Sequence, residues 1–230
     1  MNILNVEKVS KAFGEKVLLD NVTLGINKGD KIGIIGVNGT GKSTLLKIIA
    51  GIEEPDEGNI IKGRKVTVTY LAQSPDYIKD ENVLSYVLRG KDSSNEPKAK
   101  EILNKLGIDV YDAPMDKLSG GQKKRVALAK VLVEPTEVLI LDEPTNHLDI
   151  KYQLEILKIV KKLNVNVLAV LHDIQLACRF SDYIYLIKDG RIRYKGKPEE
   201  VITKDNMREI YDVECEVINR GSNQILIQYT

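Results

Sequence analysis

The segment from Gly36 to Thr44 carries the residue types that hold a chain of phosphates. Its sequence, GVNGTGKST, fits the pattern G-x-x-x-x-G-K-[ST]. Glycines allow the backbone N–H groups to turn inward around phosphate oxygens, and a helix that follows adds the positive end of its dipole. Lys42 is expected to reach the β- and γ-phosphates of ATP, and the Ser43 hydroxyl to ligate Mg²⁺. The other candidate nucleotide-binding positions of this loop are Gly36, Asn38, Gly39, Thr40, Gly41 and Thr44.

Two adjacent carboxylates, Asp142 and Glu143, follow the apolar run Val138-Leu139-Ile140-Leu141. Ligands of α/β proteins bind at the carboxyl ends of such strands. Adjacent acids at this place are as often solvated turn residues, but a phosphate-binding loop upstream favours the functional interpretation. Asp142 is expected to hold the metal through water. Glu143, pointing to the other side of the strand, is expected to polarise an attacking water.

A second anion-binding feature begins at Ser119, in the sequence LSGGQ. Ser119 is a natural N-cap, and Gly120 and Gly121 leave the N–H groups of the helix start uncovered. An ordinary capped helix explains these residues as well. It does not explain why one chain has two places that suit phosphate.

Alternating strand and helix patterns surround these motifs. Apolar strands are predicted at 31–35, 66–71, 138–141, 167–171 and 183–188, and helices at 42–50, 120–133, 151–163 and 174–180. Apolar strands that alternate with helices predict a parallel sheet covered on both faces. Residues 1–35 are predicted as short strands, 74–106 as a helical region with a loop at 90–97, and 213–229 as two strands around 219–222.

The set LSGGQ, after the phosphate-binding loop and before LILDEP, resembles the signature of ATP-binding cassette (ABC) ATPases along nearly the whole chain. The resemblance implies an α/β fold. It consists of a P-loop NTPase (RecA-like) core with an antiparallel β subdomain and an α-helical subdomain at about 74–135, all within a single domain, 1–230. It also implies hydrolysis of ATP by a head-to-tail homodimer, in which Ser119, Gly120, Gly121 and Gln122 contact the γ-phosphate on the partner's loop.

Other positions fill the family's pattern one by one. Gln73 resembles the glutamine that senses Mg²⁺ and water, and His172 resembles the switch histidine at the γ-phosphate. Asp149, in TNHLD, resembles the loop that crosses the dimer interface, and Phe13 lies where the family keeps an aromatic residue on adenine. Without the resemblance, His172 is more readily a capping or core residue and Phe13 a core aromatic.

Within the family the resemblance changes along the chain. From about 14 to 149 the sequence is similar to F-type cassettes, which are soluble twin-domain proteins that act on ribosomes. From about 153 onward it is similar to the ATPase subunits of iron-siderophore and cobalamin importers, and a single cassette of this length suits an importer subunit. We therefore hypothesise a recombined or engineered hybrid (chimera) of the two cassette types, joined near 143–149. An importer subunit with a transmembrane permease as partner is preferred over a ribosome partner, and an ATP-binding switch with little turnover is the other alternative.

Composition gives no sign of a nucleic-acid or membrane-binding protein. The 230 residues carry 34 Lys+Arg against 33 Asp+Glu, a formal charge of +1. Cys178 and Cys215 have no metal-ligand spacing, so reduced thiols are expected. No run approaches the roughly 20 apolar residues that cross a bilayer. The expected location is therefore the cytoplasm, including the inner face of the plasma membrane, without membrane insertion.

Overall fold

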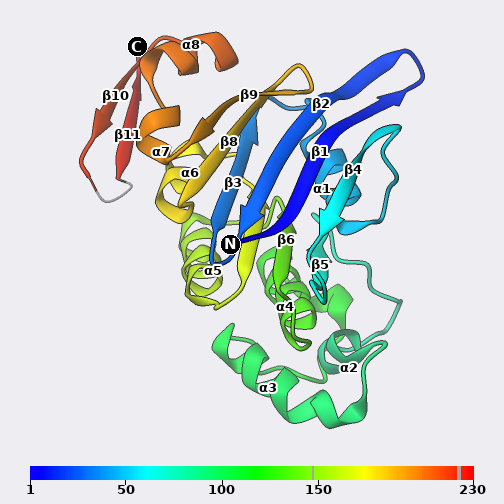
Figure 1. Cartoon of the computed structure of the whole chain (residues 1–230). Helices are drawn as coiled ribbons and strands as arrows, with labels where there is room; N and C mark the ends of the chain where they lie inside the picture. Colours follow the sequence, from blue (N-terminus) through cyan, green and yellow to red (C-terminus); the bar gives the residue numbers. More distant parts are fainter. Residues whose placement is uncertain (147, 222–223) are drawn as a thin grey trace.

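The computed structural model describes residues 1–146, 148–221 and 224–230, and within them the strands form two large sheets and a hairpin. The central sheet has the strand order β5-β6-β7-β3-β8-β9. Its strands are β3 (Lys31–Gly36), β5 (Val68–Leu71), β6 (Val138–Asp142), β7 (Asn166–Val170), β8 (Tyr183–Lys188) and β9 (Arg191–Gly196). All neighbours are parallel except β8 and β9, which pair antiparallel (Figure 1). The sheet is therefore mixed at one edge, where the sequence predicted only parallel strands.

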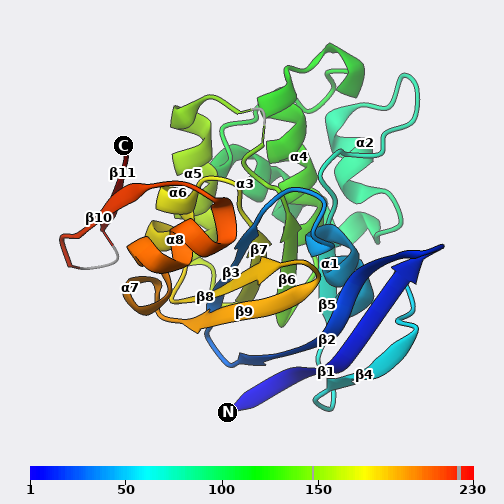
Figure 2. The same cartoon turned by 90° about the horizontal axis from the view of Figure 1, so that it is seen from above.

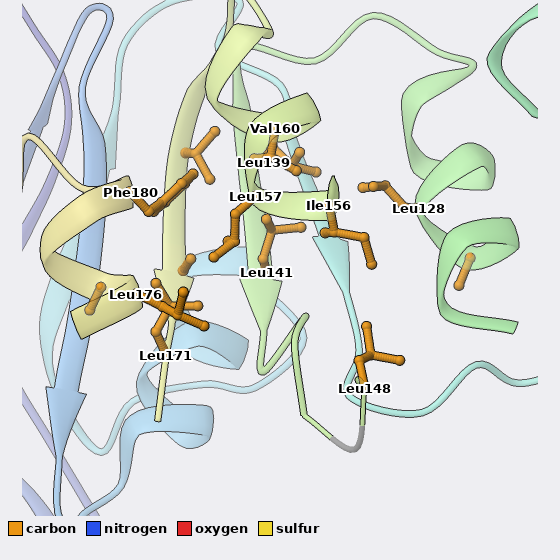
Figure 3. Packing of buried hydrophobic residues seen from close by; sticks show 14 of the residues in the cluster. Leu128, Leu139, Leu141, Leu148, Ile156, Leu157, Val160, Leu171, Leu176 and Phe180 are labelled. Carbon is orange, nitrogen blue, oxygen red and sulfur yellow. The ribbon is translucent and has the colours of Figure 1, made fainter. Parts of the chain in front are cut away.

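Helices cover both faces of this sheet because its strands are apolar on both sides. Every residue of β3, β6 and β7 is buried. Val138 and Ile140 face the core shared with α1 (Lys42–Ala50) and the N-terminal sheet. Leu139 and Leu141 face the opposite core, against α5 (Ile150–Lys162) and α6 (Ile174–Phe180), as Figure 3 shows. The side chains of β6 thus alternate between the two hydrophobic cores on either face of the sheet.

An antiparallel sheet of order β2-β1-β4 covers the α1 side. Its strands β1 (Asn2–Phe13) and β2 (Lys16–Asn27) are much longer than the short strands predicted for residues 1–35. Register shifts interrupt their pairing at several places, which breaks the alternation that a longer uniform strand would show in the sequence. The strand β4 (Glu57–Lys62) was not predicted.

The helical region lies away from the N-terminal sheet, below the central sheet in Figure 1. It contains α2 (Val83–Leu88), α3 (Glu96–Lys105), α4 (Gly120–Leu132) and short 3₁₀ turns at Ser93–Asn95 and Met115–Lys117. The predicted loop at 90–97 is too long, because α3 begins at Glu96 with Pro97 in its first turn, where proline is tolerated. The division of the chain into one domain with an inserted helical subdomain stays a prediction.

The C-terminal segment adds α7 (Pro198–Val201), α8 (Lys204–Tyr211) and the hairpin of β10 (Cys215–Asn219) and β11 (Ile225–Tyr229). Figure 2 shows these elements on the same side of the molecule. The predicted strand pair is confirmed, whereas α7 and α8 were not predicted; Ser222 of the predicted turn lies outside the described residues. Along the described part of the chain, no helix combines the length and apolar character that a membrane span requires.

Candidate nucleotide site

The loop after β3 is held tightly against its neighbours at its two ends. Gly36 ends β3 with φ +151°, and a Cβ there would lie 2.1 Å from the carbonyl oxygen of Ile187 in β8. Gly41 precedes α1 with φ +83°, and a Cβ there would lie 2.5 Å from the carbonyl oxygen of Leu18 in β2. Only glycine fits either position, because both the backbone angle and the space exclude a side chain.

Lys42 places a positive charge inside this loop. The side chain is buried, and its Nζ donates hydrogen bonds to the carbonyl oxygens of Gly36 at 2.9 Å and Val37 at 2.8 Å. Burial lowers the pKa of Lys42, and the nearby carboxylates of Glu143 and Asp142 act in the opposite direction. The ammonium group thus lies at the bottom of the loop, where it can compensate phosphate charge.

Asp142 and Ser43 form a pair of oxygen ligands beside the loop. The Ser43 hydroxyl donates to Asp142 Oδ1 at 2.9 Å, and the Tyr70 hydroxyl donates to Oδ2 at 2.8 Å. Asp142 is 4% exposed, so its carboxylate is oriented by these partners rather than by water. One carboxylate and one hydroxyl next to a phosphate-binding loop fit the way proteins hold Mg²⁺, which takes few protein ligands together with substrate phosphates.

Glu143 lies just past the end of β6, in a left-handed backbone conformation with φ +51°. Its Oε1 lies 2.6 Å from His172 Nε2. Its Oε2 accepts hydrogen bonds from Gln73 Nε2 at 2.5 Å and Asn146 Nδ2 at 2.7 Å. Because β6 ends at Asp142, the alternation of the strand does not extend to Glu143, and the expectation that Glu143 points to the other side of the strand stays a prediction.

Four adjacent strands deliver these groups to one edge of the sheet. Gln73 follows β5, Glu143 follows β6, His172 follows β7, and the glycine loop follows β3, in the spatial order β5-β6-β7-β3. A cavity of about 450 Å³ opens between them. The predicted site residues that line the cavity are Asn38, Gly39, Gly41, Lys42, Ser43, Thr44, Gln73, Glu143 and His172.

Other predicted site residues do not line this cavity. Phe13 is 52% exposed at the end of β1, with Lys11 Nζ 5.6 Å from its ring centre. Thr40 turns its hydroxyl back to the carbonyl of Val37. Gly36 and Asp142 lie beneath the cavity, in contact with Lys42 and Ser43.

Ser119 to Gln122 lie at the start of α4, also outside the lining of the cavity. Ser119 and Gln122 cap the helix reciprocally: Gln122 N–H donates to Ser119 Oγ, and Ser119 N–H donates to Gln122 Oε1. Ser119 and Gly120 are exposed. His147, in the loop before Asp149, is outside the described residues.

Sequence reasoning missed four contributors to the site. Asn146 orients Glu143, Tyr70 orients Asp142, and Lys16 and Leu18 of β2 line the cavity. Asn146 lies in the same short segment as Glu143, so its position was a usable signal. Tyr70 and the β2 residues carry no local signal, because only the tertiary fold brings them to the site.

The glycine loop and the strand order define an α/β nucleotide-binding protein of the P-loop class. The sequence matches the model of the ABC transporter family over residues 19–146, more than half of the chain. The chain therefore belongs to the ABC transporter family, and it is an ATPase of the ABC type. The expected fold class, a P-loop NTPase core, is confirmed by solved cassettes. One is the MJ0796 dimer bound to ADP and Pi, at TM-score 0.77 and 29% identity over 85% of this chain and 99% of that one.

Relatives from Bacillus subtilis differ in how much of them the chain covers. It is 36% identical to the uncharacterized ABC transporter ATP-binding protein YfmR, over 91% of this chain but only 40% of that protein. It is 33% identical to the petrobactin import ATP-binding protein YclP, over 99% of this chain and 100% of that protein. Because one importer protein aligns along both parts of the chain, the comparisons give no support to a chimera or to an F-type origin.

Proposed function

We propose that this chain hydrolyses MgATP to ADP and phosphate as an ATP-dependent homodimer, with Glu143 as the base. The observation that carries the proposal is the Glu143 carboxylate, held by Gln73, Asn146 and His172 at the cavity that Lys42 lines. A carboxylate that is oriented from both of its oxygens and faces a phosphate-binding loop suits the polarisation of a water molecule.

The roles of the other residues follow from their positions. Lys42 compensates the charge of the β- and γ-phosphates, and His172 stabilises the charge that develops on the γ-phosphate during in-line attack. Ser43 and Asp142 are the residues that would hold Mg²⁺, with Gln73 as a further candidate, and the metal would supply positive charge to neutralise the phosphates. Phe13 is proposed to stack on adenine.

The homodimer completes the site in this proposal. Ser119 to Gln122 do not line their own cavity, while the exposed N–H end of α4 suits a phosphate. The γ-phosphate of a second copy is the ligand that we assign to this end, and the dimeric post-hydrolysis form of MJ0796 supports the formation of a dimer.

Turnover per chain is therefore expected to rise with protein concentration across the monomer-to-dimer range. Phosphate release measured over a hundredfold dilution series, with sedimentation velocity of the same samples, tests this. A specific activity that stays constant while the sedimentation coefficient changes contradicts the dimer mechanism.

The biological role that we propose is that of an importer ATP-binding subunit at the inner face of the plasma membrane, bound to a permease. The name of YclP as a petrobactin import protein supports it, and so does YusV of Bacillus subtilis, a probable siderophore transport protein that is 33% identical over 94% of this chain and 88% of that one. Cofractionation with a permease, set against cosedimentation with ribosomes, separates this role from the ribosome alternative. The comparisons give no support to the ribosome and chimera alternatives.

A further inference from the structure

Lys124 of α4 reaches across to the turn that carries the proposed base. Its Nζ donates hydrogen bonds to the carbonyl oxygens of Glu143 at 3.0 Å and Asn146 at 2.6 Å. The side chain is half-buried and lies five residues after Ser119, the cap of the same helix. None of the roles assigned above uses this lysine.

Lys124 contacts a turn whose backbone conformation is unfavourable for a non-glycine residue. Glu143 has φ +51°, a strained conformation that a non-glycine residue keeps only when the surrounding structure fixes it. The turn closes on itself through the Asn146 N–H, which donates to the Glu143 carbonyl at 3.2 Å. The ammonium of Lys124 binds the carbonyls of both end residues and thus holds the turn from outside.

Lys124 makes both of these contacts as a hydrogen-bond donor. Burial lowers the pKa of this lysine, although the carboxylates of Glu143 and Asp142 act in the opposite direction. Hydrogen bonds from an ammonium to carbonyl oxygens are stronger than those from a neutral donor. The contact is therefore suited to fix a backbone position, and not merely to fill space.

We propose that Lys124 is a positioning residue that fixes the 143–146 turn and thereby aims the Glu143 carboxylate into the cavity. The proposal rests on the catalytic role proposed for Glu143. In this proposal α4 connects two parts of the molecule. The helix is capped by the exposed Ser119, and its Lys124 is hydrogen-bonded to the turn that carries Glu143 in the same chain.

A purely structural contact between helix and turn is the competing explanation. Gln153 of α5 holds the same loop from another side, because its Nε2 donates to the carbonyls of Thr145 at 3.2 Å and Leu148 at 2.9 Å. The loop therefore keeps a second anchor when Lys124 is replaced. A structural contact would affect unfolding, whereas a positioning contact affects the rate with bound ATP.

The test compares Lys124→Met with Lys124→Arg and with Lys158→Met, a matched charge removal at an exposed position of α5. For Lys124→Met we expect kcat to fall about tenfold or more, because displacement of a catalytic group by about 1 Å costs up to about 100-fold. The KM and the Kd for a fluorescent ATP analogue stay within about twofold, because the phosphate loop is untouched. Lys124→Arg, which keeps a charged donor, recovers most of the rate.

Hydrogen exchange of the nucleotide-free protein gives a second readout that does not need turnover. The amide of Asn146 donates to the Glu143 carbonyl, and the amide of Leu148 donates to the Thr145 carbonyl. Both amides are expected to exchange faster in Lys124→Met than in the wild type, and at the wild-type rate in Lys158→Met. The proposal is overturned by unchanged exchange at these amides, by an unchanged kcat, or by an arginine variant as slow as the methionine one. A wild-type protein without turnover contradicts the proposed hydrolysis instead, and the exchange comparison then still decides whether Lys124 fixes the turn.

Discussion

Replacing Glu143 by glutamine is expected to separate ATP binding from hydrolysis. Oε2 accepts from Gln73 and Asn146, so the glutamine must keep its oxygen there and turn its NH₂ group toward His172. That orientation preserves the contacts if His172 Nε2 accepts. We therefore expect a stability cost of about 1 kcal/mol, the typical value of one altered hydrogen bond.

The catalytic cost is expected to be much larger. Glutamine does not take a proton from water, and loss of a general base typically slows a reaction by about 100- to 10,000-fold. This factor corresponds to about 2.7–5.4 kcal/mol of barrier. ATP binding is retained because Lys42 and the glycine loop are unchanged, and an ATP-bound dimer is expected to accumulate since it is no longer consumed.

Sedimentation velocity with and without MgATP, together with phosphate release, measures both effects. The matched control is Glu101→Gln, which neutralises an exposed acid on α3 that pairs only with Lys105 in the described contacts. Hydrolysis that survives in Glu143→Gln at more than about a tenth of the wild-type rate would show that another group positions the water, because a lost base costs at least about 100-fold. If both proteins bind ATP but stay monomeric and silent, only the binding assignment stands.

Further substitutions test other parts of the site. Lys42→Ala is expected to abolish binding of a fluorescent ATP analogue, because phosphate charge is left uncompensated, and an unchanged affinity would refute this. Tyr70→Phe removes a donor from Asp142, worth about 1 kcal/mol, and should raise the half-saturating Mg²⁺ concentration about fivefold while Mg²⁺-free ATP binding stays constant. Burial raises the pKa of the Cys178 thiol to about 12, so Ellman's reagent at pH 8 should label it only after unfolding, and rapid labelling of the folded protein would contradict this.

The chemistry-bearing loops were predictable because their requirements are local. The backbone has positive φ angles at Gly36 and Gly41, and neither position leaves room for a side chain. Both requirements appear in the sequence as glycines at fixed distances from Lys42. The β3 and β6 strands were predictable because burial on both faces leaves an uninterrupted apolar run.

Contacts made by the tertiary fold were not predictable. Tyr70 meets Asp142 across 72 positions of sequence because β5 pairs with β6 in register, Tyr70 opposite Ile140. Lys124 looks like any cation on a helix until α4 is placed beside the end of β6. The strand β9 was not predicted either, although a signal for it was present in the sequence. Exposed Arg191, Arg193 and Lys195 alternate there with apolar residues.

Two contacts in the first part of α4 give a reason why hydrolysis would depend on a second copy. Ser119 at its start is exposed and lies outside the cavity of its own chain, whereas Lys124, little more than one turn later, is bonded to the turn of the proposed base. In the proposed homodimer, a phosphate of the partner's nucleotide at Ser119 would fix the helix start. Because Ser119 and Lys124 are little more than one turn apart, the same contact would also steady Glu143 in the chain that donates the helix. Each nucleotide would thus prepare the carboxylate that acts on the other one.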